Sequence, residues 1–192
     1  MQLNAKVLNQ FRVRPGKKLR LKDHDPGWEG DSKLSEKKRR KFAETVLAED
    51  LTLLATAQEK LYAADEWSLL VIFQAMDAAG KDSTIKHVMS GVNPQGCQVF
   101  SFKHPSAEEL DHNFLWRCMK ALPERGRIGI FNRSYYEEVL IVKVHPEFIA
   151  GERIPGAKPN KDFWKARYED INAFEKHLTR NGTTIVKFFL NV

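Results

Sequence analysis

Residues 75–84 combine small side chains, a lysine and hydroxyls in an order suited to holding phosphate. An apolar run at 69–73 leads into this segment, AMDAAGKDST, which closes on Gly80 and Lys81 and then continues as a helix pattern. At the start of a helix, backbone N–H groups point toward a bound anion, small residues let the backbone approach it, and a lysine adds a mobile positive charge. The segment therefore predicts a phosphate-binding loop.

The match to the standard loop pattern, G-x-x-x-x-G-K-[ST], is incomplete at two positions. Ala75 replaces the first glycine, and Asp82 replaces the hydroxyl residue that normally holds Mg²⁺, although Ser83 and Thr84 follow at once. A glycine-bearing turn with an exposed lysine would give a similar pattern without any ligand. The apolar run before the segment and the helical spacing after it favour the phosphate loop.

Around this loop the chain alternates between strand and helix patterns. Residues 1–32 carry Pro-Gly turn signals and predict an irregular arm, and Ser35 is the expected start of a long helix that reaches about residue 64. Strands are expected at 69–73, 98–102, 127–131 and 183–190, and helices at 80–90, 106–118, 135–144 and 161–179. Such alternation builds an α/β fold of three layers, with a parallel sheet between helices.

In a parallel α/β sheet, ligands bind beyond the carboxyl ends of the strands. This rule brings the phosphate loop close to Lys103, which follows the second strand, and to Asn132-Arg133-Ser134, which follows the third. Phosphoryl transfer needs in-line positioning, positive charge around the transferred group and a metal that bridges phosphate oxygens. The chain offers cations for phosphate (Lys81, Lys103 and Arg133) and oxygen donors for Mg²⁺ or its waters (Asp77, Asp82, Asn132 and Glu137).

Two of these side chains have a second interpretation. Asp77 would repel phosphate unless a cation lay between them, which favours a metal-linked role over a purely structural one. Arg133 could instead pair with Glu137 or Glu138 on its own helix, but its position at a strand end favours phosphate.

Composition narrows the class of protein. The 192 residues are 42% hydrophobic, enough for one good core, and their net charge of +6 suits a polyanionic partner, although solvated helix surfaces also account for basic runs. No stretch resembles a membrane span or signal peptide, and two cysteines without metal-like spacing are typical of a reducing cytosol. We expect a cytoplasmic protein with no membrane partner, and with no nucleic-acid partner because no aromatic-and-basic stacking pattern appears.

Three segments together resemble the polyphosphate kinase type 2 family of polyphosphate:nucleotide phosphotransferases. They are AMDAAGKDSTIKHVMSGVNPQG, SFKHPS and RGRIGIFNRSYYEEVLIVKVHPE, and the resemblance runs from about residue 11 to residue 190. It implies a P-loop kinase fold, with residues 33–192 as a single kinase core. It also implies transfer of the terminal phosphate of inorganic polyphosphate to a nucleoside mono- or diphosphate (AMP or ADP), or the reverse, with Mg²⁺.

The resemblance also implies roles for individual residues. Asp77 to Asp82 would form the Walker A loop, and Asn132 to Ser134 would occupy the Walker B position. Because the family often has aspartate at the position of Asn132, we expect Asp77 as well as Asn132 to be a metal ligand. The expected catalytic residues are Asp77, Lys81 and Arg133. The expected phosphate- and nucleotide-binding residues are Ala78, Ala79, Gly80, Lys81, Asp82, Ser83, Thr84, Lys103, Asn132, Arg133, Ser134 and Glu137.

Members of this family continue past the last strand into an Arg- and Lys-rich lid and further helices, which this sequence does not include. We therefore expect this chain to bind phosphate but to transfer it more slowly than a lid-bearing chain, and we expect a poorly covered strand at 185–190. We also expect a homo-oligomer. Two other functions stay open: an ATP-dependent nucleotide kinase, and a phosphate-binding domain with little or no turnover.

Overall fold

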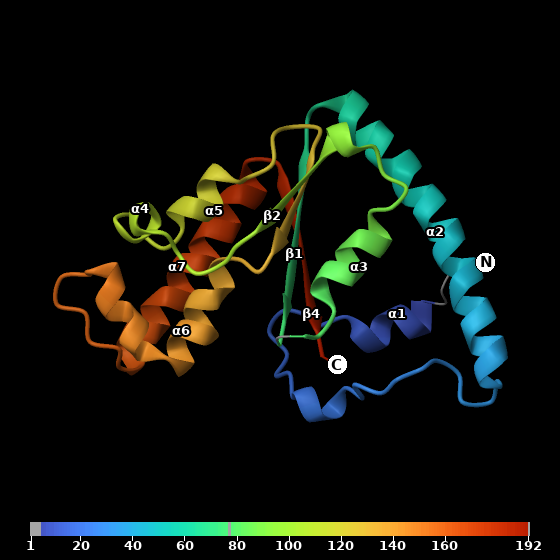
Figure 1. The fold of residues 1–192 in the computed structure, drawn as a ribbon, viewed down its shortest axis with the longest axis horizontal. Helices are drawn as coiled ribbons and strands as arrows, with labels where there is room; N and C mark the ends of the chain where they lie inside the picture. The colour runs from blue at the N-terminus through green and yellow to red at the C-terminus, as the bar shows by residue number, and fades with distance from the viewer. Residues whose placement is uncertain (1–4, 77, 192) are drawn as a thin grey trace.

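The computed structural model describes residues 5–76 and 78–191. Its centre is a four-stranded sheet in the order β2-β3-β1-β4, in which every neighbouring pair is parallel (Figure 1). The strands are β1 (Ser68–Ala75), β2 (Cys97–Ser101), β3 (Ile128–Asn132) and β4 (Thr183–Leu190). The four predicted strands and their parallel arrangement are confirmed.

The two central strands, β1 and β3, are apolar because helices cover both faces of the sheet. Leu70, Ile72 and Ile130 are at most 1% exposed, and β3 is buried at all five positions. The register pairs Phe73 of β1 with Asn132 of β3, and Ala75 with Leu190 of β4. The carboxyl ends of the strands, which carry the predicted site residues, therefore lie side by side at one end of the sheet.

One apolar cluster lies on each face of the sheet. One joins the sheet to α5 (Trp116–Lys120) and α7 (Lys161–Arg180), and the other joins it to α3 (Lys81–Val88) and α2 (Glu36–Ala64). Figure 1 shows α5 and α7 on one side of the strands and α2 and α3 on the other. The predicted three-layer α/β/α architecture is confirmed. Ser35 stands at the N-cap of α2 as predicted, but its side chain makes no capping hydrogen bond.

The N-terminal arm is more ordered than predicted. It contains helix α1 (Ala5–Phe11) and a short 3₁₀ helix, η1 (Leu21–Asp23), so the prediction of an irregular arm is wrong over these residues. The Phe11 and Trp28 rings meet edge to face with centroids 5.0 Å apart. This contact joins residues far apart in the sequence, and such contacts leave no periodic signal in it.

Two segments that were each predicted to form a single helix are divided into shorter helices, so these two predictions are wrong. The segment 106–118 divides into α4 (Ala107–Leu110) and α5, because Asn113 Oδ1 accepts a hydrogen bond from the Leu115 backbone N–H at 3.0 Å and forms a local turn. The predicted capping box of Ser106 and Glu109 at the start of α4 is confirmed.

The segment 135–144 is likewise divided, into a 3₁₀ helix η3 (Tyr135–Val139) and α6 (Ile141–Val144), followed by η4 (Pro146–Glu152). Leu140, at φ −107° and ψ −80°, interrupts the helical path between η3 and α6. These short helices build the region beyond the carboxyl end of β3.

Strand β4 lies at an edge of the sheet and is partly uncovered. Val186, Phe188 and Phe189 are 37%, 46% and 48% exposed, although the Phe188 ring stacks on Phe73. The prediction of a poorly covered last strand is confirmed.

Candidate phosphate and nucleotide site

The predicted phosphate loop joins β1 to α3. Gly80 is the N-cap of α3 in the left-handed conformation (φ 78°, ψ 22°), and Ala78 also has a positive φ of 64°. A non-glycine residue in this region is strained, and such strain persists mainly where a loop has a defined task. The first N–H groups of α3 have no partner within the helix and point toward the loop, so the turn is suited to an anion. Asp77 lies outside the described residues, and its role stays a prediction.

Lys81 is buried at the mouth of this loop. The residue is 8% exposed, and Nζ donates to the carbonyl oxygens of Ala75 at 3.3 Å and Met76 at 3.2 Å. An ammonium group makes stronger hydrogen bonds with a charged phosphate oxygen than with neutral carbonyls. Lys81 is therefore positioned so that it could exchange these carbonyl acceptors for the oxygens of a phosphate bound in the loop.

Asn132 links three strand and helix ends. Its Nδ2 donates to Oδ1 of Asp82 at the start of α3 and to Oγ of Ser101 at the end of β2, the latter at 3.4 Å. The Asp82 carboxylate and the Ser101 hydroxyl are oxygen donors of the kind that Mg²⁺ prefers, whereas Asn132 directs its amide nitrogen to this point. Mg²⁺ usually completes its shell with water and substrate phosphates. These donors fit a phosphate-bound Mg²⁺. In the described part of the chain, no three His, Cys, Asp or Glu side chains form a metal-binding group.

Gln74 was missed by sequence reasoning, although it is the polar residue that ends an apolar strand. It is 7% exposed and lies beside Ser134, which is fully buried. With its amide nitrogen directed to Glu137, Gln74 donates to Oε1 at 2.9 Å and accepts from the Ser134 hydroxyl and N–H at 3.1 and 3.2 Å. Gln74 thus connects β1 to the turn after β3.

Arg133 brings positive charge to the same turn. It has a positive φ of 63°, and its N–H donates to the carbonyl of Phe73 at 3.0 Å, which holds the turn against β1. Burial raises the pKa of Glu137, while the charges of Arg133 and Lys81 oppose that rise. The charges of two cationic side chains predicted from separate segments therefore act on one carboxylate.

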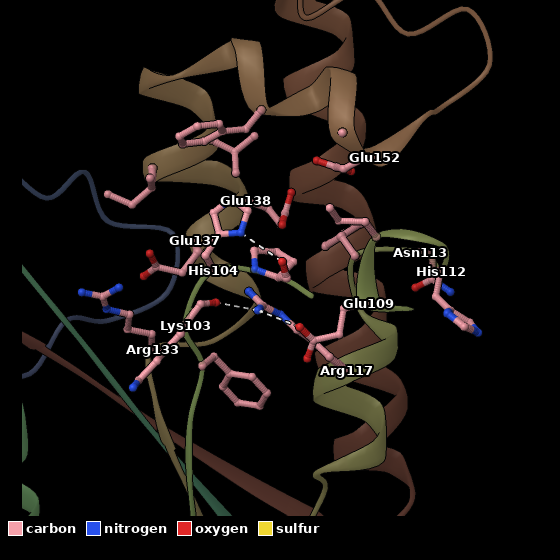
Figure 2. A pocket seen from close by; sticks show the side chains of 18 of the residues that line it. Lys103, His104, Glu109, His112, Asn113, Arg117, Arg133, Glu137, Glu138 and Glu152 are labelled. Carbon is pink, nitrogen blue, oxygen red and sulfur yellow. Dashed lines mark hydrogen bonds and ion pairs between the residues drawn. The ribbon is translucent and has the colours of Figure 1, made fainter. Parts of the chain in front are cut away.

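A cavity of about 330 Å³ opens beside this turn (Figure 2). This volume lies at the lower end of the range for small-molecule sites. Arg117, which sequence reasoning missed, donates from Nη1 to the Lys103 carbonyl at 2.7 Å and pairs with Glu109 at 3.7 Å. The lining residues are Phe102, Lys103, His104, Pro105, Glu109, Leu110, His112, Asn113, Phe114, Arg117, Arg133, Glu137, Glu138, Ile141, Val142, Glu147, Phe148, Gly151 and Glu152.

A buried ionic network supports the wall of the cavity. Arg167 of α7 is 4% exposed; it hydrogen-bonds Glu152, lies 3.7 Å from Oε2 of Glu138, and stacks 4.1 Å from the Phe114 ring centroid. Burial, together with the neighbouring charge of Glu152, raises the pKa of Glu138 to about 8, against the opposing effect of Arg167. Sequence reasoning missed this network because its members come from three separate elements.

Comparison with known proteins now identifies the family. Residues 35–192 match the family model described as polyphosphate kinase 2. The chain belongs to the polyphosphate kinase 2 family. An ADP-polyphosphate phosphotransferase of Rhodopseudomonas palustris is 53% identical over 188 residues, which are 95% of this chain and 62% of that protein. An AMP/ADP-polyphosphate phosphotransferase of Meiothermus ruber is 40% identical over 185 residues, covering 96% and 64%.

A solved structure supports the same assignment. The crystal structure of polyphosphate kinase 2 from Arthrobacter aurescens TC1 has a TM-score of 0.77 and 39% identity, covering 95% of this chain and 60% of that one. The P-loop kinase fold expected from the resemblance is confirmed. This chain therefore spans somewhat less than two thirds of the length of these polyphosphate kinase 2 relatives.

Within this polyphosphate kinase 2 fold, most of the predicted site residues converge. The loop, the turn after β3 and the cavity rim bring together Lys81, Asp82, Lys103, Asn132, Arg133, Ser134 and Glu137. The Ser83 hydroxyl donates back to the Gly80 carbonyl at 2.8 Å, and the Thr84 N–H bonds to the same carbonyl at 2.9 Å, so both stabilise the helix start. In the two described ranges, no helix has the length and apolar character needed to cross a membrane.

Proposed function

We propose that this chain is the core of a Mg²⁺-dependent phosphotransferase that moves phosphate between inorganic polyphosphate and AMP or ADP, in either direction. The observation that carries the proposal is that a phosphate loop lies next to a nucleotide-sized cavity. Lys81 belongs to the loop, Glu137 and Arg133 line the cavity, and the charges of Lys81 and Arg133 both act on Glu137. The names of the Rhodopseudomonas and Meiothermus relatives support ADP, and AMP with ADP, as acceptors.

The geometry supports binding of the polyphosphate end in the loop and of the nucleotide in the cavity. The N–H groups of α3 and the Lys81 ammonium hold the terminal phosphate of the chain. The nucleotide lies in the cavity, with its base against aromatic walls such as Phe102 and Phe148 and its phosphate toward Arg133. A terminal phosphate oxygen of the nucleotide forms the new bond to phosphorus, and the bond to the departing polyphosphate oxygen breaks.

Cationic side chains stabilise the charge on the transferred group during this step. Arg133 approaches from the cavity and Lys81 from the loop, so the phosphoryl oxygens lie between them. Glu137, held by Gln74, positions Arg133. When bound, Mg²⁺ would neutralise phosphate oxygens, and Asp82 would hold it, with Asp77 as a further predicted ligand. Asn132, the other predicted ligand, would have to turn its amide oxygen toward the metal.

A comparison of phosphate donors tests this function. The chain is supplied with ADP or AMP and Mg²⁺, together with either long-chain polyphosphate or ATP as donor, and the nucleotide products are separated and quantified. We expect product from polyphosphate at a rate well above that from ATP. A preference for ATP would indicate an ordinary nucleotide kinase. Binding of polyphosphate without product at high protein concentration would indicate a phosphate-binding domain.

We further propose a cytoplasmic location and a homo-oligomer. The free thiols of Cys97 and Cys118 are compatible with a reducing compartment, and burial raises the pKa of the Cys118 thiol to about 12, which keeps it protonated and unreactive. Light scattering on the purified chain tests the oligomer: a monomeric mass at high concentration would contradict it.

A further inference from the structure

The N-terminal arm comes back to the phosphate end of the sheet. Nδ2 of Asn191 donates to the carbonyl of His24 at 3.4 Å. Asn191 directly follows Leu190, whose register partner is Ala75, the last residue of β1, where the phosphate loop begins. Figure 1 shows the arm passing next to the ends of β1 and β4 where the loop begins. A segment far from the loop in sequence is therefore its neighbour in space.

This part of the arm is strongly basic. Residues 12–22, RVRPGKKLRLK, contain six cations and no acidic residue, and all of these side chains are exposed. Arg20 forms an exposed ion pair with Asp23 at 2.8 Å, a contact that contributes little to stability. Because His24 is only a few residues away along the chain, cations near residues 18–22 lie within about 20 Å of the strand end.

The arm also has a defined path. The Phe11 and Trp28 rings contact each other and close the segment into a loop. A turn at Pro15-Gly16, with Gly16 at φ 77° and a hydrogen bond from the Lys17 N–H to the Arg14 carbonyl at 3.3 Å, reverses it. The cations are thus displayed on an anchored loop and not on a free tail.

We propose that residues 12–22 form an accessory surface that binds the distal phosphates of a polyphosphate chain whose end lies in the phosphate loop. This inference rests on the proposed function. A linear chain carries charge along its whole length, so the part that leaves the loop needs neutralisation beyond Lys81. The arm offers a dense run of positive charge, which suits a polymer of phosphate.

The surface makes binding dependent on chain length. Tripolyphosphate fills only the loop, whereas a long chain reaches both the loop and the arm. Engaging the second surface is then intramolecular, so long chains gain affinity that short ones lack. Their binding should also depend more steeply on salt, because more charged contacts form.

The test uses the whole chain and two matched triple variants. The arm variant is Arg14→Gln, Lys17→Gln and Lys18→Gln; the control is Lys165→Gln, Lys176→Gln and Arg180→Gln, which removes the same charge from exposed positions on α7. Circular dichroism verifies that both variants fold. Dissociation constants for tripolyphosphate, long-chain polyphosphate and a single-stranded DNA of comparable charge are measured by titration calorimetry over a series of salt concentrations.

We expect the arm variant to lose roughly ten-fold in affinity for long-chain polyphosphate, with a shallower salt dependence, while the control loses less than about two-fold. Tripolyphosphate binding should be unchanged in both variants. Equal losses in the arm and control variants, or no loss in either, would overturn the proposal. An equal loss of DNA binding in the arm variant would overturn the assignment to polyphosphate. Failure of the unsubstituted chain to bind even tripolyphosphate would instead refute the proposed function itself.

Discussion

The predicted phosphate loop and the cavity proposed for the nucleotide lie side by side, but they are built in different ways. The loop lies between two regular elements, β1 and α3, and the groups that we propose to bind phosphate are backbone N–H groups and one lysine. The cavity is walled by α4, α5, η3, α6 and η4, whose positions depend on side-chain contacts such as Arg117 with Glu109 and Arg167 with Glu138. A phosphate can be bound by a helix start, whereas a nucleotide requires shaped walls.

The first prediction removes the charge at the loop. Lys81→Ala should reduce phosphate transfer from polyphosphate by about 10³-fold, because a cation aimed at the transferred group stabilises the transition state. The measurement is the initial rate of ATP formation from ADP. Lys86→Ala, at an exposed position on the same helix, is the control and should keep nearly full activity. Transfer by Lys81→Ala at the unsubstituted rate would remove this residue from the mechanism.

The second prediction breaks the cavity without touching the loop. Arg167→Met leaves Glu138 and Glu152 buried without their shared cation, so the free energy of unfolding should fall by about 3 kcal/mol. The Michaelis constant for ADP should rise, while the dissociation constant for tripolyphosphate should stay close to that of the unsubstituted chain. Urea denaturation and the two binding measurements check this.

Lys165→Met, two residues earlier on α7 and exposed, is the matched control for Arg167→Met and should change neither stability nor binding. If Arg167→Met weakened tripolyphosphate binding as strongly as ADP binding, the loop and the cavity would have to be regarded as one cooperative unit.

The same contrast explains what could be predicted from the sequence. The loop and the turn at Asn132 follow apolar strands, whose two-sided burial leaves a continuous apolar run in the sequence, so their positions were predicted correctly. The cavity walls were not. Asn113 and Leu140 interrupt helical patterns through local backbone geometry, and Arg167 looks like any charged residue on a surface helix until Phe114 and Glu152 enclose it.

The third prediction concerns pH and the cavity wall. Because burial raises the pKa of Glu138 from 4.5 to about 8, the folded chain keeps a proton on this carboxyl that the unfolded chain loses. The free energy of unfolding therefore receives a contribution that falls as pH rises from about 5 to about 8. Glu138→Gln cannot titrate, so its stability relative to the unsubstituted chain should increase over that range. Parallel urea denaturation curves that kept a constant difference at every pH would contradict this assignment.

The smallest expected effect comes from the rim of the cavity. The Ser106 hydroxyl accepts a hydrogen bond from the Glu109 N–H at 3.2 Å, and the Glu109 carboxylate accepts one from the Ser106 N–H at 2.7 Å. This capping box begins a helix of only four residues, and Glu109 also pairs with Arg117, which holds the carbonyl of Lys103. Ser106→Ala should reduce the free energy of unfolding by about 1 kcal/mol. It should also raise the Michaelis constant for ADP a few-fold, since α4 lines the cavity.

Ser106→Thr keeps the hydroxyl and should restore most of both losses, which separates the cap from the volume of the side chain. Tripolyphosphate binding should be the same in both variants, because the loop gets its geometry from β1 and α3. A loss of tripolyphosphate affinity in Ser106→Ala that Ser106→Thr repaired would show that the rim of the cavity helps to shape the phosphate loop. The backbone of β1 and α3 would then not be sufficient to define the loop.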